Sequence, residues 1–207
     1  MTEQESIVYV VDDDSAVRKA MDSLIRSVGL KARTFVSADE FLSAKLPDVP
    51  SCLILDVRMP GMSGLDLHTE LAKARIRVPV IFITGHGDVP MAVRVMKAGA
   101  MEFLTKPFRD QDLLDAIRQA IHRDRIARQE TTEAAELHQR FDALTRRERE
   151  VMRRVVGGLV NKQIAAELGI SETTVKVHRG QVMQKMKAES VPHLVRMTAK
   201  LVRPGTS

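Results

Sequence analysis

Short apolar runs that end in polar residues alternate with amphipathic segments over the first 120 residues of the chain. The polar residues that end these runs are Asp12, Asp13, Asp56, Thr84 and Lys106. Between the runs, apolar residues recur at the three- and four-residue spacing of helices. This alternation predicts a doubly wound α/β domain built on a five-stranded parallel sheet.

These polar residues are predicted to meet at one edge of the sheet, because ligands of open parallel sheets bind beyond the carboxyl ends of the strands. Asp12, Asp13 and Asp56 offer the oxygen ligands that Mg²⁺ (or Mn²⁺) prefers. The Thr84 hydroxyl and the Lys106 ammonium are suited to the charged oxygens of a phosphoryl group. A lone pair of aspartates is often only a helix cap or surface charge. Polar residues at the ends of four predicted strands favour a phosphate-handling site instead.

The two parts of the chain differ in charge. Residues 1–120 carry 15 Lys and Arg against 17 Asp and Glu, whereas residues 121–207 carry 17 against 10, which leaves the whole chain at +5. A near-neutral part joined to a basic part favours nucleic acid as the partner of the C-terminal part. A basic surface that only keeps a domain soluble is the alternative.

Composition excludes several classes of protein. Cys52 is the only cysteine, so an intrachain disulfide and a cysteine-based metal cluster are excluded. The N-terminus, MTEQES, lacks the basic start and apolar stretch of a signal peptide. No apolar run approaches the ~20 residues that cross a bilayer. We therefore expect a cytoplasmic protein that has no membrane partner.

The pattern divides the chain into three parts: the α/β domain over residues 1–121, a linker over 122–141, and a small all-helical domain over 142–207. The linker is rich in charge, has few large apolar residues and contains no Gly or Pro. This composition favours a solvated helix that continues the last helix of the α/β domain. A flexible coil is the alternative.

The C-terminal part shows short helices separated by tight turns. Thr145 and Glu148 form a capping box before one helix, Asn161 is expected to cap the next, and Ser171 the third. Gly169 stands between the second and third helices. Two short helices joined by a glycine-containing turn are typical of a helix-turn-helix, whose second helix enters the major groove of DNA. A purely structural helix pair is the alternative.

The third of these helices has two different faces. If its apolar positions face inward, polar and basic residues remain on the opposite face. Lys176 could reach guanine edges or phosphate, and Val177 a thymine methyl group. The residues predicted to contact DNA are Thr173, Thr174, Lys176, Val177, Arg179 and Lys185.

The strings VVDDDSAVR, LILDVRMPGMSG, VIFITGHGDVPMAV and EFLTKPF closely resemble the receiver domains of two-component response regulators. The resemblance covers roughly residues 6–122 and implies a flavodoxin-like sheet with strand order 2-1-3-4-5. It also implies that Asp56 accepts phosphate from a phosphohistidine of a sensor histidine kinase. Asp12 and Asp13, with Asp56 and the backbone carbonyl of Arg58, are then the metal ligands.

The resemblance assigns further roles. Thr84 and Lys106 contact the phosphoryl group, Phe103 is the aromatic residue that moves with the threonine, and the peptide bond between Lys106 and Pro107 is cis. Arg58 and His86 each follow a site residue by two positions. We predict that they lie over the phosphoryl group and control its lifetime.

The fourth helix of the α/β domain, expected to be capped by Asp88, is apolar on more than one face. A helix of this kind needs a second partner. We predict a homodimer contact that forms on phosphorylation and uses Met91, Val95 and Met96. Exposed Met and Ala without a partner are the alternative.

The string LTRREREVMRRVVGGLVNKQIAAELGISETTVKVHRGQVMQKM is similar to the LuxR/FixJ-type helix-turn-helix. Together the two resemblances imply a transcription regulator that is activated by phosphorylation and has a sensor kinase, double-stranded promoter DNA and RNA polymerase as partners. Gly180 departs from the family, because many relatives carry a polar or basic residue there.

Two other classes of function compete with this interpretation. A phosphohydrolase that works through an aspartyl-phosphate usually has a second Asp two residues after its nucleophile, and here that residue is Arg58. We therefore expect no enzymatic turnover of external substrates. A phosphorylation-independent or ligand-sensing regulator would need an apolar cavity, but it would not need Asp56, Thr84 and Lys106 at strand ends.

Overall fold

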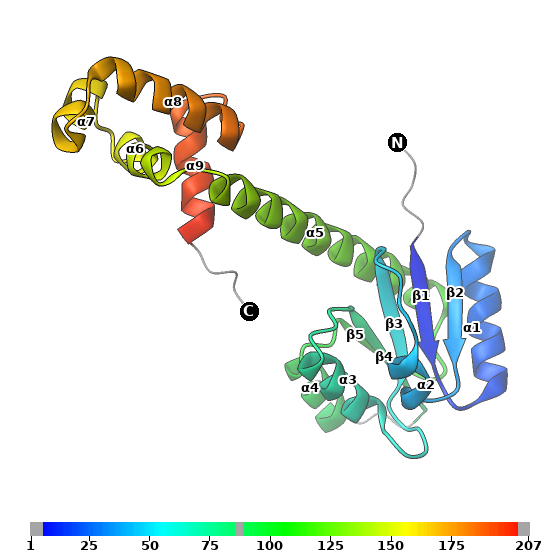
Figure 1. Ribbon diagram of the computed structural model, residues 1–207. Helices are drawn as coiled ribbons and strands as arrows, with labels where there is room; N and C mark the ends of the chain where they lie inside the picture. Colours follow the sequence, from blue (N-terminus) through cyan, green and yellow to red (C-terminus); the bar gives the residue numbers. More distant parts are fainter. Residues whose placement is uncertain (1–5, 86–88, 203–207) are drawn as a thin grey trace. The chain divides into compact units, whose positions relative to one another are not determined.

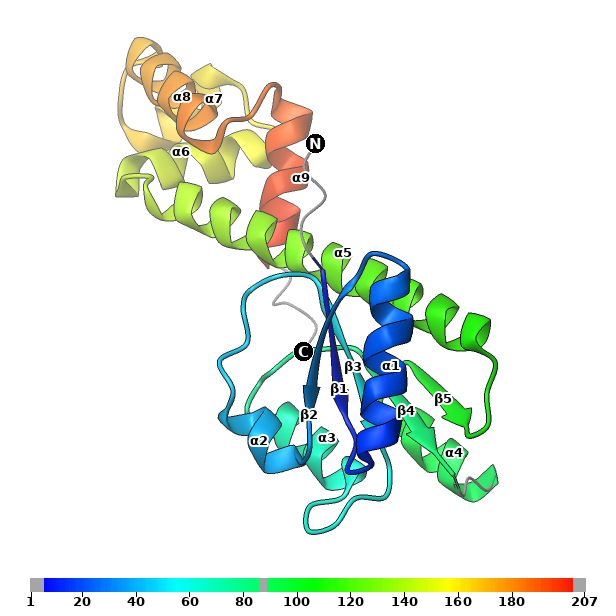
Figure 2. The same cartoon turned by 90° about the vertical axis from the view of Figure 1, so that its right-hand side faces the viewer.

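The computed structural model describes residues 6–85 and 89–202, which include one five-stranded sheet (Figure 1). Its strands are β1 (Ile7–Val11), β2 (Lys31–Phe35), β3 (Ser51–Asp56), β4 (Val80–Thr84) and β5 (Glu102–Thr105). Neighbouring strands are all parallel, in the order β2-β1-β3-β4-β5. The predicted fold class and strand order are confirmed, and the strand arrowheads point toward one edge of the sheet (Figure 2).

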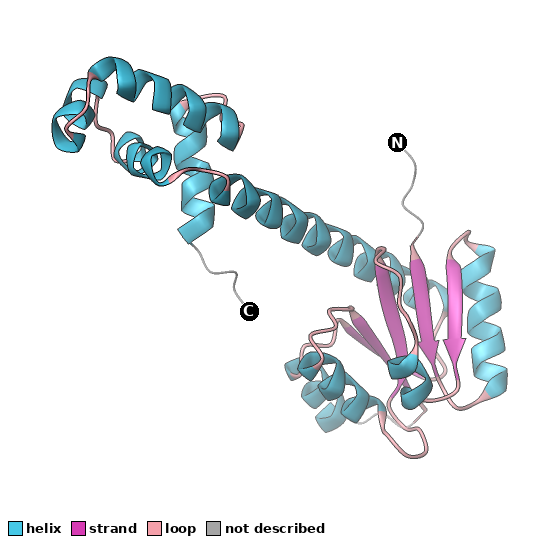
Figure 3. Ribbon diagram, in the orientation of Figure 1, coloured by secondary structure: helices cyan, strands magenta, loops and turns pink. Residues whose placement is uncertain are grey.

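Helices cover both faces of this sheet (Figure 3). They are α1 (Ser15–Ser27), α2 (Ala38–Ser43), α3 (Gly64–Lys73), α4 (Val89–Lys97) and α5 (Asp110–Asp142). On one face, Phe41 of α2, Leu67 of α3 and Val95 of α4 share a buried core. On the other, Ile25 of α1 and Ile117 of α5 share a second core. The central strands β3 and β4 are buried along their whole length, as expected of strands covered on both faces.

Side-chain caps fix where several helices begin. Asp14 accepts hydrogen bonds from the backbone at the start of α1, and Ser37 caps α2. Ser63 and Asp66 form a reciprocal capping box at the start of α3. Asp88, the expected cap of α4, lies outside the described residues. The caps place the helix starts directly after the carboxyl edge of the sheet.

The C-terminal helices form a separate core. They are α6 (Arg146–Val156), α7 (Asn161–Leu168), α8 (Glu172–Met186) and α9 (Val191–Val202). Val151, Ile164, Val182 and Leu194, one from each helix, are all fully or almost fully buried in it. Contacts between the helices thus hold the small domain together without a sheet in the part of the chain that is described.

The helix boundaries agree with most of the predicted caps. The capping box of Thr145 and Glu148 and the cap formed by Ser171 are present. Asn161 is wrong as a cap, because it is the first helical residue of α7 and Val160 precedes it in the capping position. The backbone N–H of Val160 is satisfied by the Gln163 side chain at 3.0 Å.

The chain forms two compact units, Met1–Arg128 and Gln129–Ser207. Helix α5 continues without a break through residues 122–141. No helix within residues 6–85 and 89–202 is long and apolar enough to span a membrane.

Candidate functional site

Three carboxylates gather at the carboxyl edge of the sheet. Asp12 and Asp13 directly follow β1, and Asp56 is the last residue of β3, the neighbouring strand. One oxygen from each of the three lies within 4.8 Å of the others. Asp12 is fully buried, Asp56 is 7% exposed and Asp13 is exposed. The cluster therefore reaches from the core to the solvent, as a site for a soluble reactant must.

Lys106, which follows the edge strand β5, completes this cluster. Its Nζ donates hydrogen bonds to Oδ2 of Asp12 and to Oδ2 of Asp56, both at 2.8 Å. The backbone N–H of Lys106 donates to the carbonyl of Thr84 at 2.8 Å. The predicted cis peptide bond between Lys106 and Pro107 is present.

The cluster carries more negative than positive charge. Burial raises the pKa of Asp12, and the hydrogen bonds from Lys106 and from the backbone of Asp14 only partly oppose it. Burial also acts against the Lys106 ammonium, but its hydrogen bonds to Asp12 and Asp56 prevail and raise the pKa of Lys106. Three carboxylates facing one ammonium leave a formal charge of −2, three negative and one positive. An all-oxygen donor set with this charge fits a hard divalent cation.

The backbone around Asp56 holds the carboxylate in place. The N–H of Arg58 donates to Oδ1 of Asp56 at 3.0 Å. A Cβ on Gly64 would lie 2.2 Å from the Asp56 carbonyl oxygen, so only glycine fits where α3 begins. Sequence reasoning missed this role of Gly64, although a glycine at the first position of a helix was a signal that could have found it.

The two residues expected to switch lie on neighbouring strands. Thr84 is fully buried at the end of β4. Phe103 of β5 is half-buried, stands beside Phe82 in the strand register and packs against the core that includes Val95. The ring is therefore close to buried apolar neighbours, and its movement stays a prediction. His86 lies outside the described residues.

Helix α4 exposes an apolar surface that differs from the predicted one. Val95 is wrong as a dimer contact because it is fully buried in the sheet core. Val93 and Met96 are 47% and 45% exposed, and Met91 is half-buried. The apolar surface that α4 exposes is therefore formed by Val93 and Met96, beside the half-buried Met91, which packs against the core.

Helix α8 presents the predicted outer face. Thr173, Lys176, Val177 and Gly180 are exposed on it. The Val177 side chain is 55% exposed. Polar and apolar side chains thus lie together on a surface that could read base edges.

Three other predicted DNA contacts already have partners inside the domain. Thr174 is hydrogen-bonded to the capping residue Ser171, and Arg179 donates to Oδ1 of Asn161 at 3.0 Å. The Nζ of Lys185 is paired with the buried carboxylate of Glu148 at 2.7 Å, and its contact with DNA stays a prediction.

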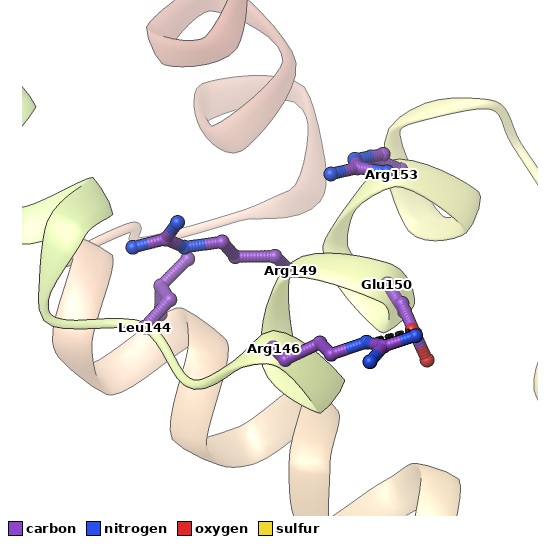
Figure 4. Close-up of a pocket in the computed structure, with 5 residues that line it drawn as sticks. All are labelled: Leu144, Arg146, Arg149, Glu150 and Arg153. Atoms are coloured by element: carbon purple, nitrogen blue, oxygen red, sulfur yellow. Dashed lines mark hydrogen bonds and ion pairs between the residues drawn. The ribbon is translucent and has the colours of Figure 1, made fainter.

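A cluster of arginines on α6 was missed from the sequence. Arg146, Arg149 and Arg153, with Leu144 and Glu150, line a hollow of about 430 Å³. Figure 4 shows Arg146 turned toward Glu150, while Arg149 extends toward Leu144. The spacing of three and four residues between these arginines was a visible signal of one basic face.

Two family models match the chain. Residues 8–118 match the response regulator receiver domain, and residues 142–198 match the bacterial regulatory proteins of the luxR family. The first match covers the acidic cluster, and the second covers α6, α7 and α8.

Known proteins resemble the chain over almost its whole length. It is 55% identical over 197 residues to nodulation protein W of Bradyrhizobium diazoefficiens, which covers 95% of this chain and 87% of that protein. It is 47% identical over 190 residues to the transcriptional regulatory protein FixJ of Azorhizobium caulinodans, with 92% and 90% covered. The solved structure of the response regulator StyR is 48% identical, covers 95% of this chain and 99% of that one, and gives a TM-score of 0.89.

Proposed function

Because this chain belongs to the response regulators that join a receiver domain to a luxR-family DNA-binding domain, and is a phosphorylation-dependent transcription regulator, we propose that Asp56 receives the phosphoryl group. The observation that carries this proposal is the setting of the Asp56 carboxylate. It ends the central strand β3, is slightly exposed, and is oriented by Lys106 and by the backbone of Arg58.

The proposed donor is a phosphohistidine of a sensor histidine kinase. An oxygen of Asp56 forms a bond to phosphorus, the phosphorus–nitrogen bond breaks, and its electron pair leaves on the imidazole. The Lys106 ammonium offsets the negative charge on the phosphoryl oxygens. Asp12, Asp13 and Asp56, with the carbonyl of Arg58, would hold Mg²⁺ or Mn²⁺, which neutralises the same oxygens when it is bound.

Phosphorylation then shifts a two-state equilibrium. The Thr84 hydroxyl moves toward the phosphoryl oxygens, and the Phe103 ring fills the space that it leaves. The altered β5 and α4 favour a homodimer through Met91, Val93 and Met96. Arg58, whose side chain is exposed beside the site, controls access of the water that ends the signal.

The dimer presents two copies of α8 to double-stranded promoter DNA. We assign base contacts to Thr173, Lys176 and Val177 and phosphate contacts to Arg179 and to the α6 arginines. RNA polymerase is the proposed downstream partner, and the cytoplasm is the proposed location. We propose no turnover of external substrates, because Arg58 occupies the position of a second catalytic aspartate.

Phosphate transfer from acetyl phosphate in the presence of Mg²⁺ tests the central step. By intact-mass spectrometry, the wild type and the matched variant Asp39→Asn, altered at an exposed helix residue, should gain one phosphoryl group. Asp56→Asn should gain none, and chelation of the metal should slow the reaction. An unchanged gain in Asp56→Asn would disprove the proposed acceptor.

Size-exclusion chromatography and DNA capture test the consequences. The phosphorylated wild type should elute as a dimer and enrich specific DNA. Met96→Glu should still be phosphorylated but should remain monomeric. Equal DNA enrichment by wild type and Asp56→Asn would favour a phosphorylation-independent or ligand-sensing regulator.

A further inference from the structure

One glycine of α8 is not required by the fold. Gly180 lies inside this helix, and its backbone lacks the positive φ that favours glycine at Gly169, where φ is 63°. A Cβ at Gly180 would meet nothing within 4 Å, whereas a Cβ at Gly64 would lie 2.2 Å from the Asp56 carbonyl oxygen. Glycine inside a helix is less favourable than alanine. No contact in the described part of the chain offsets this disadvantage at Gly180.

Gly180 lies on the outer face of α8. Val175, Val182 and Met186 are buried and mark the inner face of the helix. Gly180 is exposed and, by helix geometry, is turned away from these three residues. Its surface is therefore open to a partner of the helical unit.

Longer side chains surround Gly180 on this face. Residues three and four positions away are neighbours on the surface of a helix. Around this glycine they include Lys176, Val177 and Gln184, all of which are exposed. Lys176 and Val177 are residues to which we assign base contacts, so this step rests on the proposed function. Glycine leaves a gap between these side chains, in which a bound group can approach the helix backbone closely.

The chemistry of the gap limits what can enter it. Gly180 has no side chain, and the backbone N–H and C=O groups inside a helix are already paired with each other. The gap therefore offers neither a hydrogen-bond donor nor an acceptor. Base edges in the major groove present donors and acceptors, and the one apolar group among them is the 5-methyl group of thymine.

We propose that Gly180 is a specificity-determining residue, and that its gap receives the 5-methyl group of a thymine in the promoter DNA. The methyl group packs against the backbone of α8 and against Val177, which lies three positions away. Selection of thymine then offsets the disadvantage of glycine inside the helix.

The experiment first removes the methyl group from the DNA. Phosphorylated full-length protein selects duplexes from a random-sequence pool, and these are made again with deoxyuridine in place of one thymine at a time. Deoxyuridine keeps every hydrogen-bonding group of thymine and lacks only the methyl group. At one thymine of each half-site, the exchange should weaken binding by the wild type about fourfold, which is the value of one buried methyl group.

Gly180→Ala then adds a methyl group to the protein. It should bind the thymine duplex about tenfold more weakly than the wild type does, because two methyl groups compete for one space. Deoxyuridine at that thymine should restore much of the loss, so the variant should prefer the base that the wild type disfavours. Alanine also favours the helix, so weaker binding cannot be attributed to unfolding of α8.

The matched control is Gly157→Ala, which adds the same methyl group at the exposed end of α6. The nearest atoms to a Cβ there are 3.4 Å away, so the methyl group is accommodated. This variant should bind both duplexes as the wild type does.

Three results would overturn the proposal. The wild type could respond to deoxyuridine at no thymine, or Gly180→Ala could show the same deoxyuridine effect as the wild type, which would place the methyl group elsewhere on α8. Equal weakening of all duplexes by Gly180→Ala would indicate a contact with the DNA backbone instead. If the phosphorylated wild type selected no duplex at all, the proposed function would fail, and this proposal with it.

Discussion

Both units bury a carboxylate against a lysine, and the two pairs differ in what surrounds them. In the receiver unit, Lys106 is 2.8 Å from both Asp12 and Asp56. In the helical unit, Lys185 is 2.7 Å from Glu148. The geometry of the two is nearly the same, so distance alone does not show which pair is functional.

The pair in the helical unit is complete. Glu148 accepts from Lys185 and from the backbone N–H of Thr145, both at 2.7 Å, while the Thr145 hydroxyl accepts from the backbone of Glu148. Burial alone would raise the pKa of Glu148, but these hydrogen bonds from Lys185 and Thr145 prevail and lower it. The ionised form therefore favours the folded state, and the pair is structural.

The cluster in the receiver unit is incomplete. Asp13 adds a third carboxylate, and burial raises the pKa of Asp12, so ionised Asp12 opposes folding. The domain keeps this unfavourable charge at the edge where a cation and a phosphoryl group are proposed to bind. Unbalanced charge thus distinguishes the receiver cluster from the Glu148–Lys185 pair of the helical unit.

The largest expected loss of stability is that of Gly64→Ala, which tests how closely α3 approaches Asp56 in the receiver unit. Gly64→Ala would place a methyl group 2.2 Å from the Asp56 carbonyl oxygen, so β3 or α3 must shift. We expect a loss of about 3 kcal/mol in the free energy of unfolding, because the obstacle is backbone and not a flexible side chain. Urea unfolding followed by the fluorescence of Tyr9, the only tyrosine in a chain without tryptophan, measures the receiver unit selectively.

The matched control is Gly180→Ala in the helical unit. Gly180 is exposed in α8 and a Cβ there would meet nothing within 4 Å. Alanine should stabilise that helix by up to ~1 kcal/mol, because it has the higher helix propensity. If Gly64→Ala were tolerated as well as Gly180→Ala, the close approach at Asp56 would not be a constraint.

The next effect tests whether the pair in the helical unit is structural. Glu148→Gln removes the charge that holds Lys185 and should destabilise the helical unit by about 2 kcal/mol. This is less than for a fully buried pair, because 36% of the Lys185 side chain stays exposed. Faster hydrogen exchange in α6 and α8 would report the loss. Glu167→Gln, at an exposed pair with Arg154, should change stability by less than about 0.5 kcal/mol.

The pH dependence of this effect has a defined sign. The folded pKa of Glu148 lies below its ordinary value of 4.5, so the stability from its charge is fully present above that pH. It is lost as the pH falls through the folded pKa. The difference between wild type and Glu148→Gln should therefore be largest near neutrality and shrink below pH 4.5. A constant difference would mean that the lost packing, and not the charge, accounts for the variant.

Local patterns in the sequence predicted most of the fold. The strands were visible as apolar runs, and the helix starts at Thr145 and Ser171 were visible as caps, because both depend on residues within a few positions. Polar residues at strand ends also predicted that Asp12 and Asp56 meet Lys106, because parallel strands share an edge.

What the sequence could not show depends on partners far along the chain. Lys185 is 37 residues from Glu148, so nothing near it indicated an internal partner. Val95 has the same apolar character as Val93, and only packing against the sheet decides which of the two is exposed.

The smallest expected effect is that of Asp12→Asn, which should stabilise the protein, whereas Gly64→Ala and Glu148→Gln should destabilise it. This variant gives the sharpest test of the comparison between the receiver cluster and the Glu148–Lys185 pair. Asp12→Asn removes one of the surplus negative charges from the receiver edge and keeps a side-chain oxygen that can accept from the backbone of Asp14, which is 2.9 Å from Asp12 in the wild type. Without added metal, the variant should be more stable than the wild type by about 1 kcal/mol, because a buried charge with a raised pKa is removed. Tyr9-detected urea unfolding measures this difference.

Added Mg²⁺ should then reverse the order of the two proteins. A ligand that binds only the folded state raises stability with its concentration, so the wild type should gain stability through its complete set of carboxylates. Asp12→Asn should gain much less, whereas Asp39→Asn should behave as the wild type in both conditions. If Asp12→Asn destabilised the metal-free receiver as Glu148→Gln destabilises the helical unit, the two pairs would be alike, and charge imbalance would not be what distinguishes the functional site.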